Sequence, residues 1–250
     1  MNIVTALLGM LLLCETASAV APYPCYRSAK PKFLDGKLND WQYEPVISID
    51  GWYWRAQAGK KSVYGGMYDL WGAIRFAWDE KNLYLAASVL DDTFFPAKTG
   101  QPDSGDAIIV TIVPGELDPA SKTSQRQFLF TLNTETTTYL HCSPESWIAT
   151  NDIYLGAARN ILASTTTPIP HEPEKQPAKR LSKLFYEIAI PWKQLPGITP
   201  GPNTSMGIAV QILDNDGNGI RGSLNWHGGR DITMSPANFA LVNLENSKIK

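Results

Sequence analysis

The sequence predicts an all-β protein: a jelly-roll-like sandwich of two antiparallel sheets that forms a single domain. Apolar and polar residues alternate with period two in several short segments, and turn-forming residues separate these segments. Apolar residues at helical spacing do not continue for three turns anywhere in the chain. Sandwiches of this kind can exceed 200 residues, so a chain of 250 residues needs no second domain.

The first nineteen residues predict a secretory signal peptide. Residues 3–13 form a largely apolar run that is too short to span a bilayer, and Ala17 to Ala19 provide a small-residue cleavage site. Cleavage before Val20 would leave a secreted or periplasmic protein with a short N-terminal segment, residues 20–32, before the sandwich at 33–250. The alternative is that the apolar run forms a buried N-terminal strand.

The composition argues against several classes of partner. The chain has 22 basic and 24 acidic residues, and it therefore lacks the basic excess that nucleic acid or an anionic membrane attracts. No later apolar run approaches the eighteen residues of a membrane span. Cys25 and Cys142 remain after cleavage, either as a disulfide or as two separate thiols.

The strands are predicted from their patterns in chain order. Residues 72–78 and 183–190 alternate as half-buried strands do, with Glu187 on the more polar side of the second. Four other segments are apolar on both faces, as in central strands: 82–90, 106–113, 128–132 and 206–213. Alternation places Trp41, Trp78 and Trp192 in the core.

The connections carry the residues that turns require. Asp79, Asp91 and Asp92 bracket the strand at 82–90, and Asp side chains end strands by bonding nearby backbone groups. Residues 164–181 contain four prolines, which predicts a long exposed loop within the domain. Residues 190–195 have room for at most one helical turn.

Six motifs follow one another between residue 33 and about residue 244: FLDGKLNDW, IRFAWDEKNLYLAASVLDD, SGDAIIVTI, FYEIAIPWKQL, MGIAVQILDNDG and LNW. Their order resembles that of the family 9 carbohydrate-binding modules and related sugar-binding domains. The resemblance implies an extracellular β-sandwich that binds a polysaccharide or oligosaccharide without catalysis. It also implies attachment to, or work beside, a polysaccharide-degrading enzyme.

The expected sugar site departs from the family pattern. Members of the family hold a terminal sugar between two tryptophans, one of them three residues before an acid that corresponds to Asp106. The matching positions are Asp103 and Thr233, and neither is aromatic. Stacking rings must therefore come from elsewhere, and the candidates are Trp52, Tyr53, Trp54, Trp71, Trp147 and Trp226, with His227 and Arg230 as polar contacts.

Residues 214–219 are consistent with either a calcium-binding loop or a hairpin turn. Asp214, Asp216 and Asn218 fit the first positions of a calcium loop, but Asn225 replaces the bidentate Glu at position twelve. The other reading is a hairpin turn without metal. No other cofactor is expected.

Three other functions remain as alternatives. A glycosidase would need two facing carboxylates, for which Asp91, Asp92, Asp103 and Asp106 are available, yet each belongs to a predicted turn. Haem binding would use Met67, Met206 or His227. A sandwich that has lost its sugar site would serve as a protein-interaction module.

Overall fold

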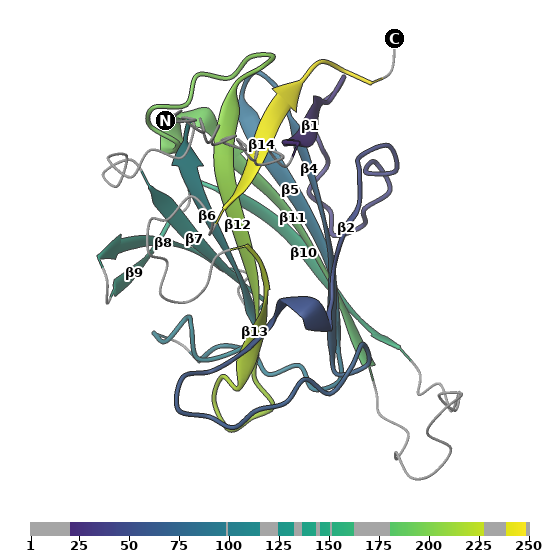
Figure 1. The fold of residues 1–250 in the computed structure, drawn as a ribbon, viewed down its shortest axis with the longest axis vertical. Coiled ribbons are helices and arrows are strands. Elements are labelled where there is room, and N and C mark those ends of the chain that lie inside the picture. The colour runs from purple at the N-terminus through teal and green to yellow at the C-terminus, as the bar shows by residue number, and fades with distance from the viewer. Residues whose placement is uncertain are drawn as a thin grey trace, which may run out of the picture.

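The chain folds as a two-layer β-sandwich in a computed structural model that describes residues 21–98, 100–115, 125–132, 137–143, 146–150, 152–162, 181–227 and 239–248 (Figure 1). Within these residues the only helical segments are two 3-10 turns, η1 (Gly51–Tyr53) and η3 (Trp192–Gln194). The described part contains no helix long and apolar enough to cross a membrane. The predicted signal peptide lies outside it.

Two groups of strands make the two layers (Figure 1). The first layer has the order β10-β11-β5-β4, with β2 also paired to β4. Its strands are β2 (Ile47–Ile49), β4 (Leu70–Trp78), β5 (Asn82–Asp91), β10 (Tyr154–Leu162) and β11 (Leu181–Pro191).

The second layer has the order β14-β12-β6-β7-β8-β9, and β13 joins β12 to β3. Its strands are β3 (Trp54–Ala56), β6 (Ala107–Pro114), β7 (Arg126–Thr131), β8 (Thr137–Ser143), β9 (Ser146–Ala149), β12 (Ser205–Asp214), β13 (Gly222–Trp226) and β14 (Ala240–Glu245).

Strand β1 (Tyr23–Arg27) connects the two layers. It runs parallel to β14, with Tyr23 opposite Val242, and parallel to β4, with Arg27 opposite Trp78. The hydrogen bonding is therefore continuous from one layer to the other, and the expectation of purely antiparallel sheets is corrected at this strand. Sequence patterns do not reveal strand direction, because alternation is the same in both orientations.

One continuous apolar cluster fills the space between the layers. Phe76 of β4 and Leu85 of β5 belong to the same cluster as Val110 of β6 and Val210 of β12. All four are at most 3% exposed. The predicted core positions Trp41, Trp78 and Trp192 are all buried, as alternation indicates.

The outer face of the first layer is also covered, which explains why β5 is apolar on both sides. Residues Leu34, Leu38 and Trp41 pack against a second buried cluster formed by Ala77, Tyr84, Ala86 and Ala189. Glu187 is fully buried beneath them, so its predicted place on a polar face is wrong. Its carboxylate accepts the backbone N–H of Gly36 at 2.6 Å and the indole N–H of Trp41 at 2.9 Å.

The C-terminal end of the predicted proline-rich loop, 164–181, and the predicted turn at Asp79 can be compared with the structure. Leu181 already begins β11 and is 8% exposed, so the predicted loop ends one residue too late. Its residues 164–180 lie outside the described part. Asp79 forms the expected turn, because its Oδ1 accepts the N–H groups of Lys81 and Asn82, both at 2.8 Å.

The structure does not form the predicted disulfide. Cys25 is a free and fully buried thiol on β1. Cys142 belongs to β8, and four strands (β14, β12, β6 and β7) separate β8 from β1 in the sheet order. A disulfide needs Cα atoms within about 7 Å, whereas neighbouring strands alone are about 4.8 Å apart. The side chain of Cys142 lies outside the described residues.

Candidate functional site

Three strands bring carboxyl groups together at one end of the sandwich. Asp91 is the last residue of β5, Asp106 directly precedes β6, and Asp214 is the last residue of β12. Each is at most 2% exposed. The predicted roles as strand terminators are therefore incomplete, because these aspartates are buried groups that meet in space.

Asp106 holds two loops in place. Its Oδ2 accepts the backbone N–H of Phe95 at 2.5 Å, and its Oδ1 accepts the backbone N–H of Asn215 at 2.7 Å. The Asn215 side chain continues the connection, because its Nδ2 donates to the carbonyl oxygen of Ser104 at 2.5 Å. The loop that follows β5 and the loop that follows β12 are thereby fixed side by side.

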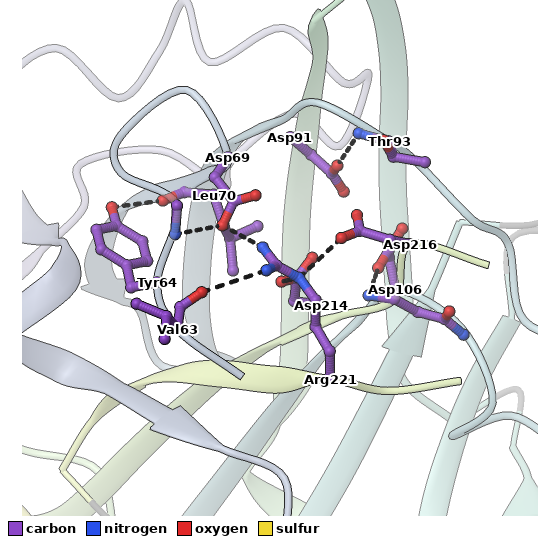
Figure 2. A network of polar contacts seen from close by, with 12 residues as sticks. Val63, Tyr64, Asp69, Leu70, Asp91, Thr93, Asp106, Asp214, Asp216 and Arg221 are labelled. Carbon is purple, nitrogen blue, oxygen red and sulfur yellow. Dashed lines mark hydrogen bonds and ion pairs between the residues drawn. The ribbon is translucent and has the colours of Figure 1, made fainter. Parts of the chain in front are cut away.

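A single arginine supplies positive charge at this cluster. Figure 2 shows the Arg221 guanidinium between Asp69, Asp214 and Asp216. It forms ion pairs with Asp69, with Asp214 at 2.5 Å and with Asp216 at 2.9 Å. Its Nη1 also donates to the carbonyl oxygen of Val63 at 3.5 Å.

Burial, together with the neighbouring acids, raises the pKa values of the buried carboxyl groups in this cluster. Burial raises the pKa of Asp91 to about 6 and that of Asp214 to about 8, although Arg221 opposes the second shift. Burial and the neighbouring Asp91 also raise the pKa of Asp106. Protonated carboxyls are therefore part of the folded cluster near neutral pH.

This shift predicts that the protein loses stability as the pH rises. The unfolded aspartate releases its proton near 3.8, whereas folded Asp91 keeps it until about pH 6 and Asp214 until about pH 8. Their stabilising contribution is therefore complete below about pH 4. As the pH rises, the contribution of Asp91 is lost by about pH 6 and that of Asp214 by about pH 8. For Asp91 alone the difference amounts to about 3 kcal/mol.

Urea unfolding at pH 5 and pH 8 measures this effect, and the larger free energy of unfolding is expected at pH 5. Asp91→Asn should make the pH dependence shallower, because the amide stays neutral and can still accept the N–H of Thr93, as Asp91 does at 2.7 Å. The control is Asp152→Asn, since Asp152 is exposed and lies 3.8 Å from Lys193. Equal slopes for the parent and Asp91→Asn would contradict the assignment.

The predicted calcium loop has the geometry of a hairpin turn. Strands β12 and β13 pair antiparallel on either side of it, and Gly217 and Gly219 adopt positive φ angles of 95° and 78°. Asp214 and Asp216 face Arg221, while the carbonyl of Asn218 accepts from Lys60 Nζ at 3.0 Å. Across the described residues no three His, Cys, Asp or Glu side chains are grouped to hold a metal.

An open hollow of about 330 Å³ lies against these loops. Phe95 and Ile220 provide apolar surface, and the polar groups come from both loops and from the segment after β3. The lining comprises Gln57, Lys60, Phe95, Lys98, Asp103, Ser104, Asn215, Gly217, Gly219 and Ile220. Asp103, which stands where the family has its first tryptophan, is exposed here with Lys98.

Two of the predicted stacking rings are engaged within the fold. Trp54 is partly buried, with the guanidinium of Arg221 5.2 Å from its ring and Tyr64 5.7 Å away. Trp71 is also partly buried, and its indole N–H donates to Ser48 Oγ at 3.2 Å. Neither ring lines the hollow.

Trp226 is a core residue, which corrects its assignment as a sugar contact. Its ring is 2% exposed and lies 5.4 Å from the ring of Tyr23 and 5.6 Å from that of Phe76. His227 is exposed, but its ring packs edge-on against Trp226, and the partial loss of water around the imidazole lowers its pKa. Met206 is fully buried, so it offers no exposed haem ligand.

Two other predicted contacts, Arg230 and the side chain of Trp147, lie outside the described residues, as does Thr233 at the family's second tryptophan position.

The structure identifies groups that the sequence analysis missed as site residues. Phe95, Lys60 and Lys98 reach the hollow from loops distant in sequence, and no local pattern links them. Trp52, which the sequence already offers as a candidate stacking ring, is 89% exposed, the most exposed of the large apolar side chains described. The flanking pair Asp50 and Gly51 is typical of a turn, so the sequence alone left the choice between core and surface open for this ring.

Comparison with known proteins places the chain in a family. The model described as "Carbohydrate family 9 binding domain-like" matches residues 48–247. No curated protein matches the chain. A family 9 carbohydrate-binding module from Caldicellulosiruptor kristjanssonii, solved with cellotriose, aligns over 90% of this chain and 95% of its own, with 13% identity and a TM-score of 0.52.

Two other solved structures share the fold at similarly low identity. The same organism's module with glucose gives 14% identity, a TM-score of 0.53 and coverage of 91% of this chain and 98% of its own. A putative carbohydrate-binding protein from Bacteroides uniformis has 11% identity and a TM-score of 0.54, and the alignment covers 90% of this chain and 100% of its own. The family match covers most of the sequence, and the chain therefore belongs to the carbohydrate family 9 binding domain-like proteins.

Proposed function

We propose that this protein binds carbohydrate without catalysis and that the hollow between the loops after β5 and β12 is its sugar site. The observation that carries the proposal is the lining of the hollow. It combines the ring of Phe95 with a carboxylate, Asp103, and an ammonium group, Lys98. Sugar rings present C–H faces to aromatic side chains and hydroxyl groups to charged ones, and this lining offers both kinds of contact.

Binding fits the carboxyl groups better than hydrolysis does. A glycosidase places two carboxyl groups on either side of a cleft. Asp91, Asp106 and Asp214 are instead buried and do not line the hollow: Asp106 accepts backbone N–H groups and Asp214 faces Arg221. Asp103 is the only acid among the residues that line the hollow.

The family relationship and the solved relatives define the ligands to test. The C. kristjanssonii module was solved with cellotriose and with glucose, so gluco-configured sugars are the first choice here. We extend the proposal to an exported module that works outside the cell beside a polysaccharide-degrading enzyme. The predicted signal peptide at 1–19 motivates that extension.

Asp103→Ala is expected to weaken sugar binding about tenfold or more, because a hydrogen bond to a charged group contributes about 1.5–3 kcal/mol. Phe95→Ala is expected to weaken it about three- to tenfold through loss of stacking. Calorimetry with glucose and cellotriose, and retention on insoluble cellulose, xylan and chitin, measure both.

The matched control is Phe33→Ala, which removes a 72% exposed ring from the segment that covers the first layer. Because Asp103 is exposed, its variant should keep the parent's melting temperature. If the parent protein binds none of these sugars or polymers, the proposed function is wrong. If it binds them and neither hollow variant changes the affinity, the site lies elsewhere.

A further inference from the structure

Trp52 presents an unusually open indole ring. The residue is the central member of η1 and is 89% exposed, whereas its neighbours Tyr53 and Trp54 are partly buried and pack against the main core. Single exposed apolar side chains are common on protein surfaces. What distinguishes Trp52 is the way in which the backbone beneath it is held.

The backbone of Trp52 is fixed by Asp50. The Asp50 side chain caps η1, because its Oδ1 accepts the Trp52 N–H at 3.1 Å. The Asp50 carbonyl accepts the N–H of Tyr53 at 2.9 Å, and the N–H of Trp54 returns to the carbonyl of Gly51. Hydrogen bonds from the backbone before and after Trp52 therefore close the turn that carries the indole.

Packing under the turn fixes it further. A Cβ at position 51 would lie 2.5 Å from the ring of Tyr64, so only glycine lets the turn sit so close to that ring. The Tyr64 hydroxyl in turn donates to the carbonyl of Leu70 at 2.8 Å. A ring held on a rigid base loses little conformational freedom when it contacts a ligand, which favours binding.

Trp52 lies a few positions before a residue that lines the hollow. Strand β3 follows η1 and ends at Ala56, and the next residue, Gln57, lines the hollow. Gln57 comes five positions after Trp52 in the sequence, so their Cα atoms are at most about 18 Å apart. Arg55 lies between them, exposed, with its Nη1 donating to the carbonyl of Trp54 at 2.8 Å.

We propose that Trp52 is a second sugar platform, which stacks on one unit of a saccharide chain while another unit of the same chain occupies the hollow. This inference rests on the proposed function. The indole supplies the flat apolar face that a hexopyranose ring covers, and the remaining N–H groups of Arg55 supply donors for its hydroxyl oxygens. The ligand class is an oligosaccharide or polysaccharide long enough to reach both places.

The two platforms predict a dependence on ligand length. Trp52→Ala should leave glucose binding unchanged, because a monosaccharide occupies the hollow alone. The same variant should bind long cello-oligosaccharides, and retain polysaccharide, about three- to tenfold more weakly, since one stacked ring is lost. Trp52→Phe, which restores a ring, should recover part of that loss.

Calorimetry with glucose and cellohexaose, together with retention on cellulose, tests this length dependence for the parent and for Trp52→Ala, Trp52→Phe and Phe33→Ala. Phe33→Ala is the matched control, since it removes another exposed ring, and it should behave as the parent does. Thermal unfolding of the same four proteins should give one common melting temperature.

Three outcomes separate this inference from the proposed function. If the parent binds sugars and Trp52→Ala binds the long ligands equally well, the second platform is overturned and the proposed function stands. If Trp52→Ala also loses glucose, Trp52 belongs to the primary site and the two-platform arrangement is wrong. A parent that binds none of the sugars overturns both.

Discussion

We expect Trp226→Ala to lower the free energy of unfolding by about 3–5 kcal/mol, which is a large share of the stability of a typical domain. The ring of Trp226 connects three strands, because it reaches from β13 to Tyr23 of β1 and to Phe76 of β4. Truncation leaves a cavity between the layers that neighbouring side chains fill only in part. Urea unfolding with fluorescence detection measures the loss.

Trp52→Ala provides the comparison for that variant. Both changes remove an indole, but Trp52 is 89% exposed and Trp226 is 2% exposed. Trp52→Ala should therefore change the free energy of unfolding by about 0.5 kcal/mol or less. Similar losses for the two variants would show that the burial of Trp226 does not govern its contribution.

Arg221→Met should destabilise the protein by about 3–5 kcal/mol at pH 8. The change removes the cation that faces Asp69, Asp214 and Asp216, and two of these acids remain buried without a counter-charge. The loss should be smaller at pH 5, because Asp214, whose pKa burial raises to about 8, then holds a proton and needs no cation.

A second substitution tests that explanation. Adding Asp214→Asn to Arg221→Met removes one uncompensated carboxylate and should restore part of the stability at pH 8. Arg55→Met is the matched control, since Arg55 lies opposite Ser223 on the neighbouring strand and is exposed. If the double variant is no more stable than Arg221→Met, charge is not the cause of the loss.

The sequence predicted the sandwich because the alternation of apolar and polar residues along a strand reflects which side chains are buried. Trp78 ends a strand of clear alternation, Trp41 and Trp192 stand inside motifs that resemble the family, and all three are buried. The loop tryptophans have no such period, and their order of exposure was not predicted: Trp54 packs under Arg221, whereas Trp52 is open. A residue in an irregular turn is placed by contacts from distant segments, as Trp54 is by Arg221.

The candidate site was less predictable because its parts meet only in the folded chain. Asp91 and Asp214 are the last residues of a strand and Asp106 directly precedes one, so each reads locally as a turn residue. Their meeting depends on β5 and β12 ending, and β6 beginning, at the same end of the sandwich. The order of strands in a sheet is not encoded in any one segment, and for the same reason the sequence left the choice between a disulfide and two separate thiols open.

The parallel pairing of β1 with β14 has a mechanical consequence. Tyr23, at the start of β1, lies opposite Val242, and Tyr26 lies opposite Glu245 at the end of β14. Tension applied at the start of β1 and the end of β14 would slide these strands past each other, and the bonds between them would share the load. Strands joined in this way resist pulling more strongly than a hairpin that opens one bond at a time. A protein anchored to a polymer under flow would keep its two layers together through this one strand.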